Sequence, residues 1–170
     1  MIELFTADTP NGIKIPIALE ELGLPYQVRL MTLGGAEMRS PEFTRVNPNG
    51  KIPSIRYQDD ASEQAITVFE SGAILLHLAD LCGDLTGTSV HVRAQTLSWL
   101  FLQVAGLGPA MGAAGHFLSR RGQDPYAFVR FRSEAARLLG ILESRIEESG
   151  WFNGESYSIA DIAHFGWVRR

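Results

Sequence analysis

Two short segments near the middle of the chain carry residues that could together bind a small peptide. The first is Ile52-Pro53 at the start of a predicted strand, where proline has no N–H to give to the sheet. If this bond is cis, the N–H and C=O groups of Ile52 point out of the sheet and can pair with an extended peptide. The second is Glu70-Ser71, where a strand gives way to an apolar-periodic helix whose free N–H groups suit a carboxylate. Together they predict a site for a small zwitterionic peptide.

Each of these residues also has a purely structural interpretation. The Ile52-Pro53 segment can serve only to begin a strand, and Ser71 can cap its helix, a role compatible with ligand binding. Lys51 either pairs with a ligand carboxylate or stays solvated. Thr9 and Asn11, between the first predicted strand and helix, are of the types that form turns and helix caps.

The combination of segments resembles the glutathione-binding half of the glutathione transferase superfamily. Further matching segments are residues 5–12 (FTADTPNG), residues 41–43 (PEF) and residues 47–49 (NPN). As a set they are similar to the nu-class branch, the bacterial relatives of the yeast nitrogen-regulator protein. The resemblance runs from residue 1 almost to residue 170, and no single segment would carry it alone.

The resemblance implies that glutathione is the co-substrate and that its sulfur faces Thr9 and Asn11 as a thiolate. The thiolate is the nucleophile, and an ordinary thiol has a pKa near ~8.5. Lowering that pKa by two units takes roughly 2.7 kcal/mol of preferential thiolate stabilisation. One or two hydrogen-bond donors at a helix N-terminus can supply this. In other transferases a Tyr, Ser or Cys takes the role that the resemblance gives here to Asn11 and Thr9.

The resemblance also implies a set of glutathione-binding residues, namely Lys51, Ile52, Pro53, Glu70, Ser71 and Arg130. In this set Glu70 accepts the γ-glutamyl ammonium, while Ser71 and its N–H receive the α-carboxylate. Arg130 occupies the place where relatives bring an arginine to the site, in some cases across a dimer interface. A surface arginine on an amphipathic helix explains it equally well. The four histidines are dispersed without metal-ligand spacing, so no metal is expected.

Two features depart from the family pattern. Met38 stands near the position where relatives tend to carry a polar side chain that contacts the glycyl end of glutathione, and a thioether cannot replace a strong donor. Family members also continue with further helices beyond the point that corresponds to Arg170. The second domain therefore looks truncated, and apolar surface on it is expected to be bare or covered by a partner.

Bulk composition is that of an ordinary globular chain. The 170 residues are 45% hydrophobic and 20% charged, with a net charge of −4 and scattered arginines, which does not favour nucleic-acid binding. No signal peptide is evident, and no apolar run approaches the roughly 18 residues of a membrane span. The single cysteine, Cys82, cannot form an internal disulfide or a Cys-x-x-Cys motif. A cytoplasmic protein is expected.

The elements that must position the candidate residues form an α/β thioredoxin-like N-terminal domain with the order βαβαββα over residues 1–82. Alternation, turn residues and helix signals place them at residues 2–6, 12–22, 26–30, 40–46, 54–57, 65–68 and 71–82. Residues 83–89 form a linker. An all-α C-terminal domain then covers residues 90–170.

Four helical segments are expected in the C-terminal domain. A long helix begins at residue 90 and must be kinked or interrupted at residues 106–109 (GLGP), beyond which residues 111–118 continue it. Asp124-Pro125 starts another helix that extends to about residue 148. Residues 158–161 (SIAD) have the form of a capping box, with the acid three residues after the cap.

The sequence therefore predicts a cytoplasmic, homodimeric, glutathione-dependent enzyme with its site in the cleft between two domains. Activated glutathione would reduce disulfides or peroxides or be conjugated to electrophiles, and disulfide reduction ranks first because glutathione can supply both sulfurs. The alternative is a non-catalytic glutathione-transferase-like module for protein binding or regulation, because a fold does not fix a function. The acceptor substrate stays open.

Overall fold

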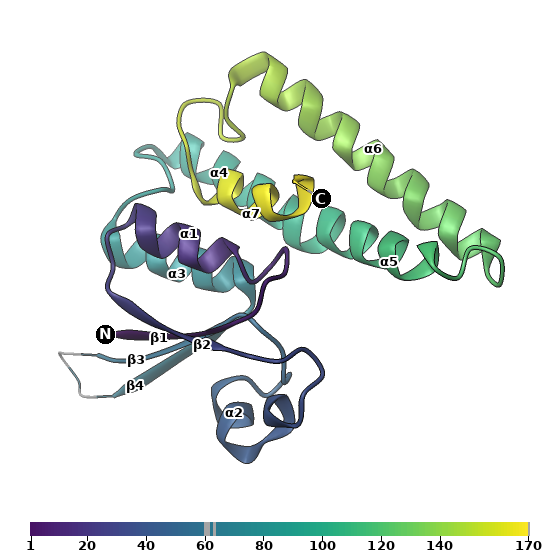
Figure 1. The fold of residues 1–170 in the computed structure, drawn as a ribbon. Helices are drawn as coiled ribbons and strands as arrows, with labels where there is room; N and C mark the ends of the chain where they lie inside the picture. Colours follow the sequence, from purple (N-terminus) through teal and green to yellow (C-terminus); the bar gives the residue numbers. More distant parts are fainter. Residues whose placement is uncertain (60–61, 63, 170) are drawn as a thin grey trace. The chain divides into compact units, whose positions relative to one another are not determined.

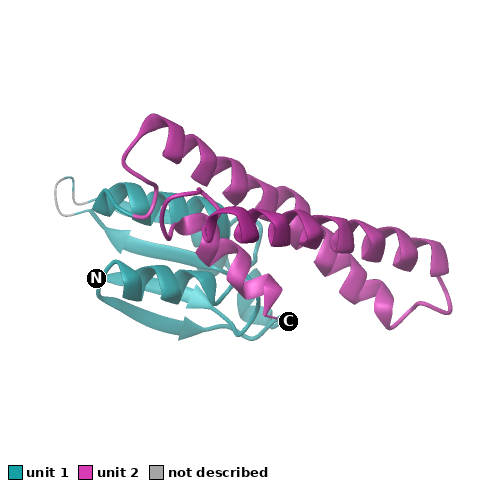
Figure 2. Cartoon of the chain, turned by 90° about the horizontal axis from the view of Figure 1, so that it is seen from above, with its two compact units in different colours: residues 1–84 teal, residues 85–170 magenta. Residues whose placement is uncertain are grey.

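The structure is a computed structural model that describes residues 1–59, 62 and 64–169, and it divides into two compact units. The first unit spans Met1–Asp84 and the second spans Leu85–Arg170 (Figure 2). An α/β unit thus precedes an all-helical one, which confirms the predicted fold class.

The first unit is built on a four-stranded mixed sheet. Its strands are β1 (Ile2–Thr6), β2 (Tyr26–Leu30), β3 (Ser54–Gln58) and β4 (Ala65–Phe69), in the order β2-β1-β3-β4. β1 runs parallel to β2 and antiparallel to β3, and β3 is antiparallel to β4. Leu4 on β1 pairs with Ile55 on β3, and both side chains are fully buried.

Helices cover both faces of this sheet. α1 (Lys14–Glu21) and α3 (Ser71–Cys82) lie side by side on one face, and α2 (Pro41–Val46) lies on the other, after the short 3₁₀ helix η1 (Ala36–Arg39) (Figure 1). The side chains between the sheet and the helix pair are aliphatic and fully buried, among them Leu4, Ile15, Leu19, Ile55, Ile74 and Leu75. The starts of α1 and α3 carry the candidate residues, so this packing positions them.

The helix signals in the sequence predict the bounds of α3 and the capped start of α2 correctly, but they place the start of α1 too early. α3 begins and ends at the predicted residues, and Ser40 caps α2 by accepting a hydrogen bond from the Phe43 amide at 3.1 Å. α1 begins at Lys14, two residues later than predicted, because residues 10–13 form a tight turn before the helix. That turn holds Asn11.

The second unit consists of long helices. α4 (Val90–Leu102) continues through a π-helical turn, η2 (Gln103–Leu107), into α5 (Gly108–Leu118), and α6 (Pro125–Ser149) and α7 (Ile159–Val168) pack against this stretch. The helix therefore does not break at the predicted kink at residues 106–109. Its hydrogen-bond pattern changes there, and the helix continues. Pro109 falls in the first turn of α5, where its missing N–H is tolerated.

The stretch from Val90 to Leu118 is long and apolar enough, by length and composition alone, to cross a membrane. This corrects the expectation that no apolar run approaches that length. One such helix is a weak indication of a membrane span, because the core helix of a globular unit passes the same test. Here Leu100 and Leu107 of the stretch are buried within the helical unit.

The start of α7 is fixed by the predicted capping box. The Ala160 amide donates to Ser158 Oγ at 3.3 Å, and the Ser158 amide donates to Asp161 Oδ2 at 2.9 Å. Asp161 Oδ1 also accepts a hydrogen bond from the Phe152 amide at 3.2 Å. Asp161 thereby joins the helix to the turn before it, and Ala160 and Phe152 belong to the same buried cluster.

The hydrogen bonds of the capping box lead to a testable prediction about stability. Asp161→Ala should lower the free energy of unfolding by about 2 kcal/mol, because the amides of Phe152 and Ser158 lose their acceptor. Urea denaturation followed by circular dichroism measures the change. Glu147→Ala, on the exposed face of α6, is the control and should change stability by less than about 0.5 kcal/mol. Equal effects of the two substitutions would contradict the assigned role.

Candidate functional site

The turn between β1 and α1 is shaped by two threonines. The Gly12 amide donates to Thr9 Oγ1 at 2.9 Å, and Thr6 Oγ1 donates to the Gly12 carbonyl at 2.9 Å. The Thr9 amide donates to the Ala7 carbonyl at 2.8 Å. Thr9 thus stabilises the turn and does not cap α1, whose N-cap is Ile13 without a side-chain cap, and Asn11 lies half-buried in the same turn. Their role toward a glutathione sulfur stays a prediction.

Gly12 is essential to this turn because the backbone approaches it closely. A Cβ atom built on Gly12 would lie 2.0 Å from the Ala7 carbonyl oxygen and 2.9 Å from Thr9 Oγ1. The nearest obstacle is backbone, which cannot swing aside as a flexible side chain would. The short distance between the end of β1 and the start of α1 is therefore possible only for glycine.

A second turn presents the Ile52-Pro53 segment, and Asn47 organises it. The Asn47 side chain is buried and donates to the Lys51 carbonyl at 2.6 Å and to Ser54 Oγ at 3.2 Å, while its oxygen accepts from the Asn49 amide at 2.9 Å. The Ile52-Pro53 peptide bond is cis. Within the described residues, the amide and carbonyl of Ile52 have no hydrogen-bond partner, so they are available to an extended ligand.

The remaining members of this segment differ in exposure. Lys51 is exposed and Pro53 is buried. Met38 is buried in an apolar cluster with Phe5 and Phe43, against which Ile52 packs. The side chain that departs from the family pattern therefore belongs to the apolar cluster against which Ile52 packs.

The start of α3 has an unusual backbone. Glu70 stands at the N-cap with φ of 71° and ψ of 119°, and its exposed side chain makes no capping hydrogen bond. A non-glycine residue in this region costs about 1–3 kcal/mol, and such residues cluster at functional sites. Ser71, the first residue of α3, is buried. The arrangement leaves a carboxylate exposed beside the N–H groups of a helix start.

Lys14, at the first position of α1, is a functional candidate that the sequence analysis missed. Its side chain is fully buried, and its Nζ lies 3.3 Å from Ser71 Oγ. Burial lowers the pKa of this ammonium group from 10.5 to about 7, and the negative charge of Glu70 opposes part of the fall. Helical spacing could have revealed it, because Lys14 stands four residues before Ala18 on the buried face of α1.

The structure places most of the predicted residues in the first unit and one of them in the second. Glu70 and Ser71 form a cluster with Lys14, while Lys51, Ile52 and Pro53 lie on one turn in the same unit. Arg130 belongs to the helical unit, where it is exposed on α6. Its contribution to the site stays a prediction. Among the described residues, no group of three or more acidic, histidine or cysteine side chains could hold a metal ion.

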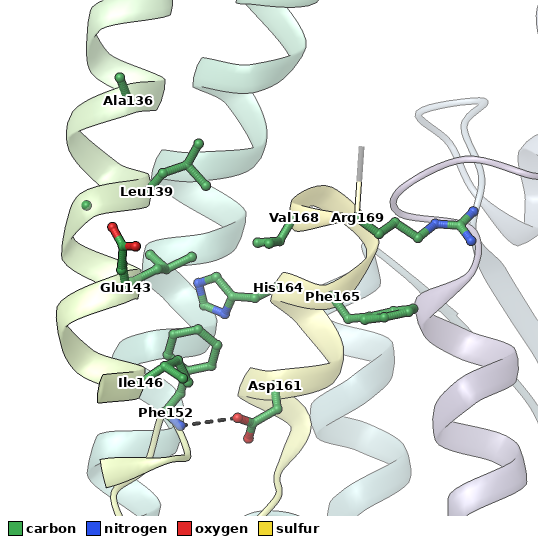
Figure 3. A pocket seen from close by; sticks show the side chains of 12 residues that line it. Ala136, Leu139, Glu143, Ile146, Phe152, Asp161, His164, Phe165, Val168 and Arg169 are labelled. Atoms are coloured by element: carbon green, nitrogen blue, oxygen red, sulfur yellow. Dashed lines mark hydrogen bonds between the residues drawn. The ribbon is translucent and has the colours of Figure 1, made fainter. Parts of the chain in front are cut away.

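The helical unit contains a separate pocket of about 820 Å³ between α6 and α7 (Figure 3). His164 and Val168 point from α7 toward α6, and Ile146 and Phe152 also line the pocket. None of the predicted site residues lines it. Ile146, Phe165 and Val168, which line this pocket, are partly exposed.

Two parts of the chain match known protein families. Residues 10–81 match the family of the glutathione S-transferase N-terminal domain, and residues 125–170 match that of the C-terminal domain. The chain is 46% identical over 170 residues to the disulfide-bond oxidoreductase YfcG of Escherichia coli K12, covering 99% of this chain and 79% of that protein. It is 38% identical to the protein URE2 of Eremothecium gossypii over 146 residues, which cover 82% of this chain and 40% of that protein.

A solved structure extends the similarity to three dimensions. It is the crystal structure of a glutathione transferase from Pseudomonas putida with one glutathione disulfide bound per subunit. The TM-score is 0.93 with 40% sequence identity, and the match covers 99% of this chain and 74% of that one. The sequence similarity therefore extends to a shared fold.

The turn at Gly12 makes a prediction about stability. Gly12→Ala should lower the free energy of unfolding by about 3 kcal/mol or more, because the added Cβ meets the Ala7 carbonyl. Gly115→Ala in α5 is the matched control, since its Cβ would meet nothing within 4 Å. It should stabilise the protein by about 0.5–1 kcal/mol. A harmless Gly12→Ala substitution in chemical denaturation would contradict the close approach.

Burial of Lys14 predicts a pH dependence of stability. Between pH 7 and pH 10 the unfolded chain holds the Lys14 proton while the folded protein releases it, so the free energy of unfolding rises with pH. The contribution approaches about 1.4 kcal/mol per pH unit and vanishes below pH 7, where both states are protonated. Lys14→Met should remove this slope.

Urea denaturation at pH 6, 7, 8 and 9 tests this linkage in the wild type and the variant. The stability difference between them should favour Lys14→Met most at pH 6 and shrink from pH 7 upward. Leu19→Met, a buried substitution on the same helix with similar volume, controls for packing. Parallel pH profiles of all three proteins would mean that Lys14 keeps an ordinary pKa.

Proposed function

Because this chain belongs to the glutathione S-transferase family, we propose that it binds glutathione and uses the glutathione thiolate to reduce disulfides. The observation that carries the proposal is the start of α3, where the strained Glu70 backbone leaves a carboxylate beside buried Ser71 and the helix N–H groups. A γ-glutamyl group carries an ammonium and a carboxylate on one carbon. These two charges match the carboxylate of Glu70 and the N–H groups at Ser71.

The other predicted residues complete this assignment. The amide and carbonyl of Ile52 pair with the cysteinyl backbone of glutathione, as a strand edge pairs with an extended peptide. Lys51, exposed on the same turn, faces a ligand carboxylate. Asn11 and Thr9 stand at the start of α1, where hydrogen-bond donors and the helix dipole favour a thiolate. Arg130 contributes from α6 of the same or a partner subunit of a homodimer.

Disulfide reduction needs no cysteine from the protein. The thiolate of a first glutathione attacks one sulfur of the substrate disulfide, forming a mixed disulfide and releasing the other sulfur as a thiolate. A second glutathione thiolate attacks the glutathione sulfur of the mixed disulfide and releases the second substrate thiol. Two glutathiones are oxidised to glutathione disulfide while the substrate is reduced to two thiols. The glutathione disulfide bound in the Pseudomonas putida relative and the name of YfcG support this reaction.

The position of the chain's one cysteine agrees with a mechanism that uses no protein cysteine. Cys82 is exposed at the far end of α3, at the opposite end of the helix from Ser71. It therefore has no place in the exchange. Peroxide reduction and conjugation would use the same thiolate, and we propose them as secondary activities of a cytoplasmic enzyme.

Calorimetric titration with reduced and oxidised glutathione tests the site. The wild type should bind in the micromolar to millimolar range, and Glu70→Gln and Ser71→Ala should each weaken binding at least tenfold, since each loses a charge-assisted hydrogen bond. Asn11→Ala should retain binding but lower the rate of glutathione-dependent disulfide reduction at least tenfold.

Matched controls separate site effects from general ones. Glu147→Gln and Ser98→Ala change the same residue types on exposed helix faces and should bind as the wild type does. Cys82→Ser should reduce disulfides at the wild-type rate. A cooperatively folded protein that binds neither form of glutathione would reject the enzyme and favour a non-catalytic binding module. Binding without turnover of any disulfide would reject disulfide reduction alone.

A further inference from the structure

The buried lysine beneath the start of α3 has no part in the mechanism described above. Lys14 is one of two lysines in the sequence, and its fully buried side chain contrasts with the exposed Lys51. Its Nζ reaches across from α1 to Ser71 Oγ at 3.3 Å, although 57 residues separate the two in sequence. Burying a charged lysine costs free energy, and ionisable groups with shifted pKa values cluster at functional sites, so the position of Lys14 under a proposed ligand group points to a role there.

The chemistry of the pair depends on the charge of Lys14. A charged ammonium group has three donors and no acceptor, so it must donate to Ser71 Oγ. The Ser71 hydroxyl hydrogen is then free to point at a ligand. A neutral amine has a lone pair that can accept this same hydrogen, which would turn the hydroxyl away from the ligand. A neutral amine can still donate as well as accept, so only the charged form of Lys14 forces the Ser71 hydroxyl to donate elsewhere.

We propose that Lys14 is a positioning residue for the α-carboxylate of the γ-glutamyl group, acting through Ser71, and that binding of this carboxylate draws a proton onto Lys14. The inference rests on the proposed glutathione site and adds a group to it that does not touch the ligand. In the bound state the ammonium donates to Ser71 Oγ, and Ser71 donates to the carboxylate. Two hydrogen bonds through Ser71 thus connect the negative charge of the ligand to the buried positive charge of Lys14.

The surroundings of Lys14 favour proton uptake on binding. In the free protein burial holds the pKa of Lys14 at about 7, so the group is about half protonated at neutral pH. The carboxylate of Glu70 is a charged group whose field acts on Lys14, and Ser71 on α3 is one of its polar contacts. An opposite charge within about 4–6 Å favours the charged form of a lysine.

Calorimetry with S-methylglutathione measures this linkage, because methylation removes the titrating thiol of the ligand. Titrations in phosphate and in Tris at the same pH give the protons bound per site, since the two buffers differ in ionisation enthalpy. The wild type should take up about half a proton at pH 7 and more at pH 8. Its affinity should correspondingly fall about three- to fivefold between these pH values.

Lys14→Met should bind about tenfold more weakly than the wild type at pH 6.5, with uptake and pH dependence reduced to those of the ligand's own ammonium group. Leu19→Met, buried on the same helix, should behave as the wild type. S-methylglutathione with its γ-glutamyl α-carboxylate converted to an amide should bind weakly and without the Lys14-dependent uptake. Thermal melts of both variants confirm that they are folded.

The outcomes separate this inference from the proposed function. Equal proton uptake by the wild type and Lys14→Met would overturn the role of Lys14 while leaving the glutathione site intact. Loss of affinity in Lys14→Met without any change in uptake or pH dependence would reduce Lys14 to a packing residue and also overturn the inference. Failure of the folded wild type to bind S-methylglutathione would reject the proposed site, and the inference with it.

Discussion

The close packing of α1 against α3 is the constraint on which the candidate site depends. It places the first residue of α1 against the first residue of α3, so that Lys14 meets Ser71 inside the unit. Both helix starts therefore point their free N–H groups toward the same end of the sheet. A buried ammonium group and a strained Glu70 backbone both oppose folding. Two destabilising features at one place are typical of a binding site, where the residues serve ligand binding rather than stability.

The two turns that flank this cluster are built on one physical principle. Each has a short polar side chain that replaces missing backbone partners, Thr9 in the turn after β1 and Asn47 in the turn before β3. Neither turn has regular secondary structure, so without these side chains its backbone polar groups would lack partners. The side chains that shape the loops thereby fix the positions of Asn11 and Ile52, which carry the proposed contacts.

The helical unit is held together differently. Its core joins η2, α5, α6 and α7 through apolar contacts, and the capping box of α7 connects that helix to the turn at Phe152. The partly exposed apolar side chains between α6 and α7 line a pocket rather than complete a core. Arg130 lies on the exposed part of α6, in a unit that contributes nothing else to the predicted site. The other residues predicted to bind glutathione all belong to the α/β unit.

The sequence by itself determined the order of the elements, the start of α3 and the segments Ile52-Pro53 and Glu70-Ser71. These depend on local signals such as turn residues, helix caps and apolar periodicity, which act over a few residues. Only the tertiary structure showed that Lys14 contacts Ser71, that Met38 belongs to the cluster against which Ile52 packs and that the helix continues through a π turn at residues 103–107. The first two depend on contacts between residues distant in sequence. The third is a change of hydrogen-bond pattern that the local signal at residues 106–109 indicated only as a kink or an interruption.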